Sequence, residues 1–237
     1  MISGKLVAIC TGTPTDYGTE GAEAPFDRRW RTSFYKMPVI GPRWLSSTNV
    51  DGDAQADTKA HGGPEKAVLA YSVDHYPLWN DEYPDLDLGH GAFAENLDMQ
   101  GLSESSVCLG DTWQIGEAII QINQARMPCW KISRRWRTHG MSRRVQETGR
   151  TGWYHRILQE GEIEAGMEVV LLERPYGAWT IERCNRVMHE LKTDRAQSAE
   201  LAALPELAES WKRVLSKRAD TGENPDEESR LLGANKV

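Results

Sequence analysis

The sequence lacks the nucleotide-binding motifs that would identify several common classes of enzyme. Its 237 residues contain neither G-x-x-x-x-G-K-[ST] nor G-x-G-x-x-G, so it has no P-loop and no dinucleotide-binding fingerprint. It also lacks a C-x-x-C pair, because Cys10, Cys108, Cys129 and Cys184 are widely scattered. This spacing argues against a zinc ribbon and a thioredoxin-like dithiol. In a reducing compartment all four cysteines are expected to be free thiols.

Long apolar segments are also missing. The longest apolar runs, such as residues 67–71 and 169–172, are far shorter than the ~20 residues that span a bilayer, so no membrane helix is expected. The N-terminal residues lack the basic region and apolar stretch typical of a secretory signal. We therefore expect a cytoplasmic protein. Phenylalanine is scarce, with three residues against nine tryptophans, and most of these indoles are expected to lie in the core.

The charge of the chain is unevenly distributed. The net charge is -7, yet residues 126–150 contain eight Lys or Arg and a single acid, Glu147. That stretch therefore carries +7, and the rest of the chain carries -14. An acidic protein that concentrates its positive charge around one cysteine, Cys129, is expected to handle an anion there.

Hydrophobic periodicity indicates a mainly β protein with helices. Apolar residues alternate, or form short runs, in segments that end at glycine-rich turns. Residues 74–79 and 153–160 are instead expected to form brief helical turns. Short strands at irregular spacing favour a β-barrel decorated with helices. The predicted strands are residues 2–9, 67–71, 107–113, 117–122 and 168–172.

After Pro175 the apolar period changes to 3.6, which predicts three short helices. Thr180 should cap the first helix, Asp194 has capping-box spacing ahead of the second, and the third could begin at Pro205. The residues from 218 onward are acidic, polar and broken, so a disordered tail is expected. The predicted organisation is a β-barrel domain at 1–175, a three-helix appendage at 176–217 and a tail at 218–237.

Cys129 is the first candidate for chemistry. Arg126 and Lys131 are close in sequence, Pro128 restricts the backbone and Trp130 supplies an apolar wall. Nearby cations favour the thiolate, which is both a nucleophile and a soft ligand for a metal such as molybdenum. The alternative is a structural thiol beside a solvated basic face, because free cysteines usually pack as small hydrophobes.

A glycine-rich turn at residues 61–66 is the second candidate. Gly62 and Gly63 allow backbone N–H groups to converge on an anion, while His61 and Lys66 add donors. The alternative is an ordinary turn that enters a strand. Residues 52–57 supply two carboxylates and an amide that could orient His61. Asn96 is the polar candidate in the bend at 91–97.

Together these segments resemble the MOSC domain, named for the C-terminal domain of molybdenum cofactor sulfurases. The resemblance covers residues 1–172, and the three-helix appendage resembles that of the bacterial YiiM-type members. Residues 151–154, Gly161 and 166–167 extend the match. The matching segments, in order, are KMPV at 36–39, 52–63 ending in HGG, GAFAENL at 91–97, VCLGD at 107–111 and QARMPCWK at 124–131.

The resemblance implies a β-barrel that binds a pterin-based molybdenum cofactor, with Cys129 as the protein ligand to the metal. It also implies reduction of small N-hydroxylated compounds, such as hydroxylamino purine analogues, with electrons from a separate flavin-containing NAD(P)H reductase. Ala94 stands where the motif has glycine, and residues 46–50 replace a more apolar stretch. The residues expected to line the cofactor or substrate pocket are Lys36, His61, Gly62, Gly63, Lys66, Asn96 and Arg126.

Two other functions compete with a molybdoenzyme. The protein could be a carrier of sulfur or of the molybdenum cofactor, with a persulfide on Cys129 and no turnover at the metal. It could also bind nucleic acid through the basic stretch at 126–150, because single-strand binders mix aromatic and basic residues. The charge of -14 on the rest of the chain makes a nucleic-acid partner the least favoured of the three.

Overall fold

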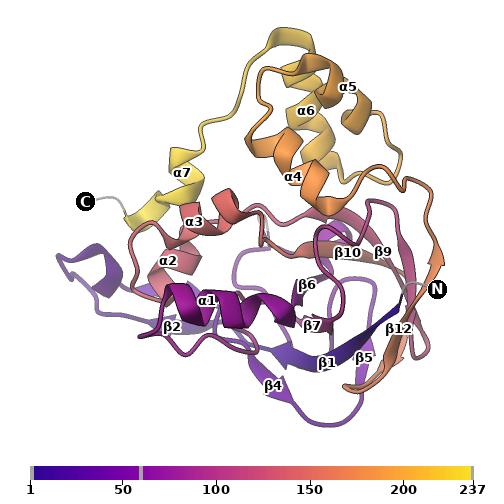
Figure 1. The fold of residues 1–237 in the computed structure, drawn as a ribbon. Coiled ribbons are helices and arrows are strands. Elements are labelled where there is room, and N and C mark those ends of the chain that lie inside the picture. The colour runs from indigo at the N-terminus through magenta and orange to yellow at the C-terminus, as the bar shows by residue number, and fades with distance from the viewer. Residues whose placement is uncertain (1–2, 59–60, 236–237) are drawn as a thin grey trace.

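The centre of the computed structural model, which describes residues 3–58 and 61–235, is a closed β-barrel (Figure 1). Within those residues seven strands follow one another in the order β12, β8, β9, β10, β6, β7 and β1, and β1 pairs with β12 to close the ring. Closure removes the exposed edges that an open sheet would have. The barrel strands are β1 (Ser3–Thr11), β6 (Val68–Ser72), β7 (Leu97–Gln100), β8 (Thr112–Ile115), β9 (Ala118–Ala125), β10 (Trp153–Gln159) and β12 (Glu168–Glu173).

One pair of barrel strands, β6 and β7, runs parallel, with Ala70 opposite Leu97. The other neighbouring pairs in the ring are antiparallel. Parallel neighbours need a crossover connection, and here it contains η3 (Val73–His75) and α1 (Tyr76–Glu82). The crossover returns through residues 90–96, which therefore reach β7 from the end of the barrel where β6 begins.

Shorter elements surround the barrel. The strand β4 (Met37–Val39) pairs with β1, and the hairpin of β2 and β3 extends away from the ring. Two helices, α2 and α3, follow β9 in sequence. The remaining elements of this part are β2 (Thr15–Tyr17), η1 (Pro25–Asp27), β3 (Trp30–Thr32), β5 (Arg43–Leu45), η2 (Pro64–Lys66), α2 (Lys131–Arg135), α3 (Met141–Thr148) and β11 (Gly161–Ile163).

Two hydrophobic clusters form the core. The larger fills the barrel around Trp113 and Trp153 and continues without a break to Trp211 in the C-terminal helices. The smaller lies among α1, α2 and α3, where Trp79 and Phe93 are buried. Each fully buried aromatic side chain of this size contributes about 3 kcal/mol to folding. The expectation that most tryptophans belong to the core is confirmed.

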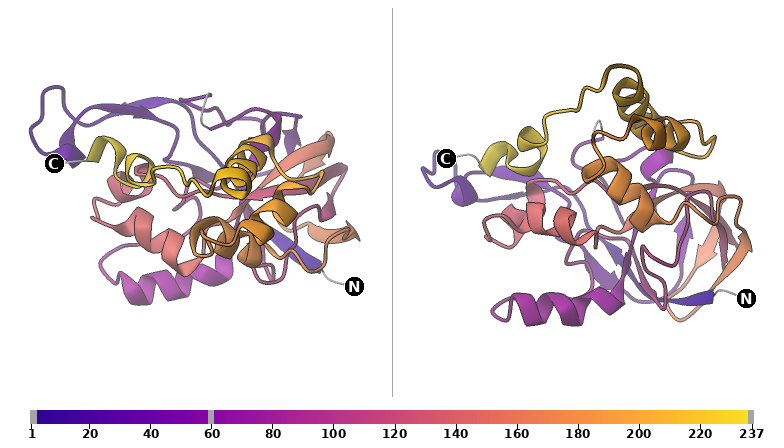
Figure 2. Two further views of the ribbon diagram at one scale, coloured as in Figure 1. Left: turned by 90° about the horizontal axis from the view of Figure 1, so that it is seen from above. Right: turned by 45° about the horizontal axis from the view of Figure 1, so that its top comes forward.

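Three helices follow the barrel and stack on one side of it (Figures 1 and 2). They are α4 (Ile181–His189), α5 (Arg195–Ala202) and α6 (Glu209–Thr221). Both predicted caps are present: Thr180 accepts a hydrogen bond of 3.1 Å from the Arg183 N–H, and Asp194 accepts one of 3.0 Å from the Gln197 N–H. None of the helices in the described part of the chain is both long and apolar enough to cross a membrane.

Several predicted elements were misplaced. In the predicted helical turn 153–160, residues 153–159 instead form the strand β10, in which Trp153 and His155 are buried and which pairs with both β9 and β6. In the predicted strand 107–113, residues 107–111 lie outside any strand, and β8 begins at Thr112. The third helix begins at Glu209 instead of Pro205. Ile2, in the predicted strand 2–9, lies outside the described residues.

The prediction of a disordered tail from residue 218 is wrong for the residues that the structure describes. Helix α6 continues to Thr221, and the Arg218 side chain is buried against α4, donating to the carbonyl oxygens of Val187 (2.6 Å) and Met188 (2.8 Å). The helix α7 (Glu228–Leu231) and the turn η4 (Gly233–Asn235) follow. The sequence did not predict this ordered structure, because the segment is polar and has no apolar period. Long-range hydrogen bonds hold it in place instead.

Candidate functional site

One pocket of about 600 Å³, its open mouth included, gathers the candidate residues. Its walls come from the β3–β4 connection, residues 54–57 and 61–62, the 94–96 bend and the loop between β9 and α2. Gly63 is absent from its lining. The predicted residues that do line it are Lys36, His61, Gly62, Lys66, Asn96, Arg126 and Cys129.

Cys129 occupies the irregular loop between the end of β9 and the start of α2. The residue is half-buried, and its Sγ lies 3.7 Å from Nε2 of His61. On the other side of the imidazole, Nδ1 lies 3.5 Å from Oδ2 of Asp57. The carboxylate, the imidazole and the thiol are therefore arranged in series, although Nδ1 of His61 makes no hydrogen bond to the described residues.

The electrostatics of the pocket favour a thiolate at Cys129. Burial alone would raise the pKa of this thiol, but the hydrogen bond and charge of His61, the charge of Arg126 and the Lys131 N–H lower it to about 6. At neutral pH the thiolate therefore predominates. The other three cysteines are buried, and burial raises the pKa of each of them. Cys129 is thus the reactive cysteine of this chain.

The rate of alkylation of Cys129 by iodoacetamide should rise through a midpoint near pH 6, since the thiolate and not the thiol reacts. In His61→Gln protein the midpoint should move up by about one unit or more, because the hydrogen bond and charge of the imidazole are lost. Mass spectrometry of the Cys129 peptide at a series of pH values measures both midpoints.

His75→Gln is the matched control for that substitution. His75 lies 2.6 Å from Glu104, outside the pocket lining, so its replacement should leave the midpoint unchanged. A midpoint above pH 8 in the unsubstituted protein would contradict the assignment of Cys129 as a thiolate.

Arg126 carries the clearest signal for an anion. The residue is 5% exposed, and its Nη1 is buried with no hydrogen-bond partner among the described residues. Ser33 Oγ, also in the lining, has the same status. A buried polar group without a hydrogen-bond partner costs about 1–3 kcal/mol if it is neutral and more if it is charged. The unpaired guanidinium N–H therefore points to a ligand that accepts its hydrogen bond. Lys66 adds a second cation, whose pKa is lowered by burial.

The two glycines of the turn have different positions. Gly62 has φ 139° and lines the pocket next to Gln55. Gly63 has φ 82° and precedes the turn η2, facing open space. Both angles lie in the region that favours glycine. Gly62 can therefore contact a ligand directly, whereas Gly63 shapes the turn that brings Lys66 to the pocket.

Lys36 and Asn96 line the wall, but their polar groups are engaged by the protein. Lys36 Nζ lies 2.5 Å from Oδ2 of Asp53, and burial lowers the pKa of this lysine. The Asn96 amide accepts from the Leu69 N–H at 3.3 Å and donates to the Cys10 carbonyl at 3.2 Å. These bonds tie the 94–96 bend to β6 and β1, so both residues shape the pocket as well as line it.

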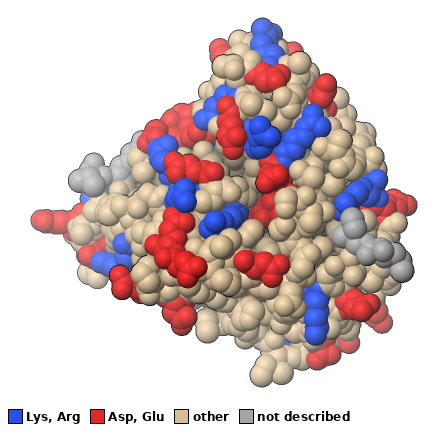
Figure 3. Space-filling view, viewed as in Figure 1, with Lys and Arg blue, Asp and Glu red and all other residues tan. Residues whose placement is uncertain are grey.

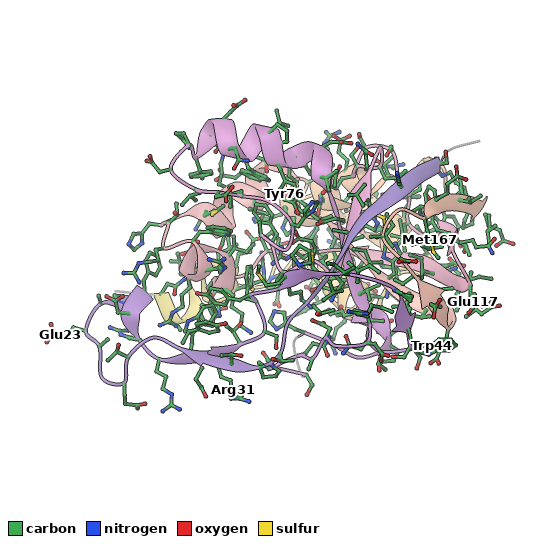
Figure 4. The ribbon with its side chains drawn as sticks, turned by 90° about the horizontal axis from the view of Figure 1, so that it is seen from below. Glu23, Arg31, Trp44, Tyr76, Glu117 and Met167 are labelled. Carbon is green, nitrogen blue, oxygen red and sulfur yellow. The ribbon has the colours of Figure 1, made fainter. Side chains whose placement is uncertain are left out.

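Behind this wall lies a buried cluster of carboxyl groups that sequence patterns did not reveal. Glu95 and Asp98 are both fully buried, and the hydroxyl of Tyr76 lies within hydrogen-bond distance of both carboxyl groups, at 2.9 Å in the case of Asp98. Figure 4 shows Tyr76 between α1 and the strands. Burial and the charge of Asp98 raise the pKa of Glu95 to about 7. His90 Nδ1, 2.6 Å from Asp98, connects the cluster to the surface and fixes the 90–96 segment.

Ala94, in the same segment, has φ 63°, which costs an L-residue about 1 kcal/mol or more. This explains why glycine suits the position. Ala94→Gly should therefore raise the free energy of unfolding by up to about 1 kcal/mol, net of the entropy that glycine gains in the unfolded chain. Ala92, outside the left-handed region, is the matched control, and Ala92→Gly should destabilise. Urea denaturation checks both, and a destabilised Ala94→Gly protein would contradict the strain assigned to this position.

Four of the eight basic residues in the stretch 126–150 pair with acidic side chains, among the described residues. Arg137 pairs with Asp27 at 2.7 Å, Arg144 with Glu82 at 2.5 Å, and Arg143 with Glu228. On the face shown in Figure 3, acidic and basic side chains are interspersed. Arg126 and Lys131 are the members of the stretch that line the pocket. The anion site is thus narrower than the sequence suggested, and the pairing weakens the case for a nucleic-acid surface.

Sequence reasoning missed the flat walls of the pocket. Phe34 lies before β4, and its ring is 6.0 Å from the Arg126 guanidinium. Tyr154, on β10, faces Lys66 with its ring centroid 6.0 Å from Nζ. Strand pairing between segments far apart in sequence places these two rings in the pocket. The mistaken helical assignment of 153–160 removed the signal that alternation along β10 could have given for Tyr154.

Comparison with known proteins identifies both parts of the chain. Residues 57–170 match the MOSC domain, and residues 179–222 match the YiiM-like, 3-alpha helix domain. The chain is 35% identical over 193 residues to the uncharacterized protein YflK of Bacillus subtilis, which covers 81% of this chain and 87% of that protein. It is 33% identical over 200 residues to protein YiiM of Escherichia coli, covering 84% and 89% respectively.

A solved structure supports the same relationship. The crystal structure of YiiM from Escherichia coli superposes with a TM-score of 0.79 at 27% identity, covering 96% of this chain and 98% of that one. A protein of Gibberella moniliformis named reductase is 37% identical over 177 residues, which is 73% of this chain and 31% of that protein. The expected barrel with a three-helix C-terminal domain is therefore confirmed in kind.

Proposed function

This chain belongs to the MOSC domain family and carries the three-helix domain of its YiiM-like members, and we propose that it is a molybdenum-cofactor-dependent reductase of small N-hydroxylated compounds. The family is associated with binding of the molybdenum cofactor. The observation that carries the proposal is one pocket that combines a thiolate cysteine with a buried, unsatisfied guanidinium. The relative named reductase supports redox chemistry.

The residues of the pocket fit the chemistry of this cofactor. Its phosphate would take the free Nη1 of Arg126, with Lys66 as a second cation. Its metal would take the soft Sγ of Cys129. Phe34 and Tyr154 offer aromatic surfaces suited to a flat pterin. When bound, the cofactor would supply the two-electron chemistry, and the protein supplies position, proton and electrostatics.

The pocket also contains a residue that can supply a proton to the reaction. Reduction of R–NHOH to R–NH2 breaks the N–O bond, takes up two electrons and two protons, and releases water. His61 can hold a proton at Nε2, which lies in the pocket wall 3.7 Å from the Cys129 sulfur, and would donate it to the leaving oxygen of the substrate. The Asp57 carboxylate, 3.5 Å from Nδ1, would stabilise the protonated ring by its charge. The electrons must come from outside the chain, and we assign them to a separate flavin-containing NAD(P)H reductase.

A direct assay tests this function. The full-length protein, made in a host that synthesises the cofactor, is supplied with reduced methyl viologen and 6-hydroxylaminopurine, and the amine product is measured by chromatography. We expect turnover that is absent when the same protein comes from a host unable to make the cofactor. Failure of molybdenum-loaded protein to reduce this compound and other N-hydroxylated bases or amidines would reject the proposed reaction.

A sulfur carrier is the second candidate, favoured by the Cys129–His61 pair and the thiolate it stabilises. In that case Cys129 would bear a persulfide and the pocket would hold no pterin. Native mass spectrometry distinguishes the two functions. An adduct of about 32 daltons on Cys129 without bound pterin would support the carrier.

A further inference from the structure

The C-terminal segment lies against the loop that contains Cys129, although about a hundred residues separate them in sequence. In Figure 1, and in both views of Figure 2, α7 lies beside α2 and α3. The backbone N–H of Trp130 donates to the carbonyl of Arg230 at 2.8 Å, and Asn235 Nδ2 donates to the carbonyl of Trp130 at 2.8 Å. Arg230 Nη1 donates to the carbonyl of Pro128. Both neighbours of Cys129 are therefore held by this segment.

Arg230 also connects the Cys129 loop to α3. Its Nη2 donates to Oε1 of Gln146 at 2.7 Å, and its side chain is 19% exposed. Two contacts reinforce this arrangement. Glu228 pairs with Arg143 on α3, and Gly233 packs so closely on the Trp130 indole that an added Cβ would collide with it. The guanidinium thus bridges two elements that border the cysteine.

The same segment is anchored at its other end to the three-helix domain. The carboxylate of Glu227 lies 3.3 Å from Nδ1 of His189, the last residue of α4, and 2.5 Å from Nζ of Lys192, which follows the helix. Its Oε1 also lies 3.5 Å from Nη2 of Arg230. Leu231, only 1% exposed, buries the apolar side of α7. A continuous set of contacts therefore runs from α4 to the cysteine loop.

We propose that residues 227–235 brace the Cys129 loop, with Arg230 as a positioning residue and the three-helix domain as the anchor of the brace. A loop has no strand or helix ladder of its own, so its conformation depends on the groups that bond its carbonyl and N–H groups. Here the groups on both sides of Cys129 are satisfied by the brace. The inference depends on the proposed function only in taking Cys129 as the functional residue, and it gives the three-helix domain a role.

Substitution of Arg230 in the full-length, cofactor-free chain tests the brace. Arg230→Met keeps the apolar stem but removes both side-chain hydrogen bonds. We expect amide exchange of Trp130 to accelerate at least about tenfold, because one charge-assisted hydrogen bond already contributes about that factor. The pH midpoint for alkylation of Cys129 should also rise, because the positive charge of Arg230, which interacts with the Cys129 thiolate, is removed. Arg230→Lys should restore the midpoint but not the slow exchange.

Arg195→Met is the matched control. Arg195 also donates to two carbonyl oxygens, those of Ala219 (2.6 Å) and Asp220 (2.5 Å), but at the far side of the three-helix domain. It should leave residues 128–131 and the alkylation midpoint unchanged. If Arg230→Met protein kept the wild-type amide exchange rate of Trp130 and the wild-type alkylation midpoint of Cys129, the proposal would be overturned. It would also be overturned if amide exchange accelerated equally in peptides from the whole barrel, because Arg230 would then stabilise the fold in general.

Glu227→Gln tests the anchor separately and serves if Arg230→Met does not fold. It retains Arg230 but weakens the bonds to α4, so exchange at residues 128–131 should rise by a smaller factor than in Arg230→Met. Unchanged exchange there would reject the anchoring role of the three-helix domain. Because these measurements need neither cofactor nor substrate, they can fail while the proposed reaction stands, and the reverse also holds.

Discussion

Replacing Cys129 by serine is expected to reduce the amount of molybdenum bound to the protein by at least about 100-fold. Loss of a residue that merely supports a metal ligand already costs about 10–100-fold in affinity. A serine hydroxyl remains protonated at neutral pH and is a hard oxygen donor, whereas the pKa of Cys129, near 6, makes it a thiolate. Reduction of N-hydroxylated substrates should fall with the metal. Elemental analysis of the purified variant measures the first effect, and the viologen-linked assay measures the second.

Cys108→Ser is the control for this experiment. The Cys108 thiol is buried at 1% exposure and donates to the Gly177 carbonyl at 3.6 Å, a hydrogen bond that a hydroxyl can also make. This variant should keep its molybdenum and activity. If Cys129→Ser protein retained as much metal and activity as Cys108→Ser protein, Cys129 would not be the ligand.

Replacing Arg126 by methionine should weaken cofactor retention by about 10–100-fold, the effect of losing a charge-assisted hydrogen bond to phosphate. The same change should leave the free energy of unfolding of the cofactor-free protein unchanged or higher, since Nη1 of Arg126 is buried without a partner among the described residues. Loss of binding without loss of stability separates a ligand contact from a structural residue. Molybdenum content after dialysis and urea denaturation measure the two quantities.

Arg144→Met provides the comparison within the same basic stretch. Arg144 pairs with Glu82 on the surface at 2.5 Å and does not line the pocket, so cofactor retention should be unaffected. A strongly destabilised cofactor-free Arg126→Met protein would show that this guanidinium stabilises the fold itself, and would contradict its assignment as a ligand contact.

Much of the pocket could be predicted because its residues lie in short local motifs. His61, Gly62 and Lys66 share one turn, and Arg126 and Cys129 share one loop, so proximity in sequence already implied proximity in space. The buried strand β6 and the capped helices α4 and α5 were visible in their patterns for the same reason. Each of these features depends on interactions within a few residues.

The features that were missed depend on distant contacts. Tyr154 reaches the pocket only because β10 pairs with β9 and β6, and the apolar residues of 153–160 also suit a helical period. The segment from residue 218 has no apolar period in its sequence. It is held in place by hydrogen bonds and ion pairs of Arg218, Glu227 and Arg230. The basic stretch suggested a broad anion site because sequence does not reveal partners such as Asp27 and Glu82.

Joint analysis of metal and pterin in the purified full-length protein tests the central claim most directly. Protein from a host that makes the cofactor should contain molybdenum and pterin in near-equal amounts, and both should be lost together in Cys129→Ser. The contrary result is folded protein from the same host that contains neither component, although its Cys129 still reacts with iodoacetamide with a midpoint near pH 6. That result would contradict the assignment of this pocket to the molybdenum cofactor.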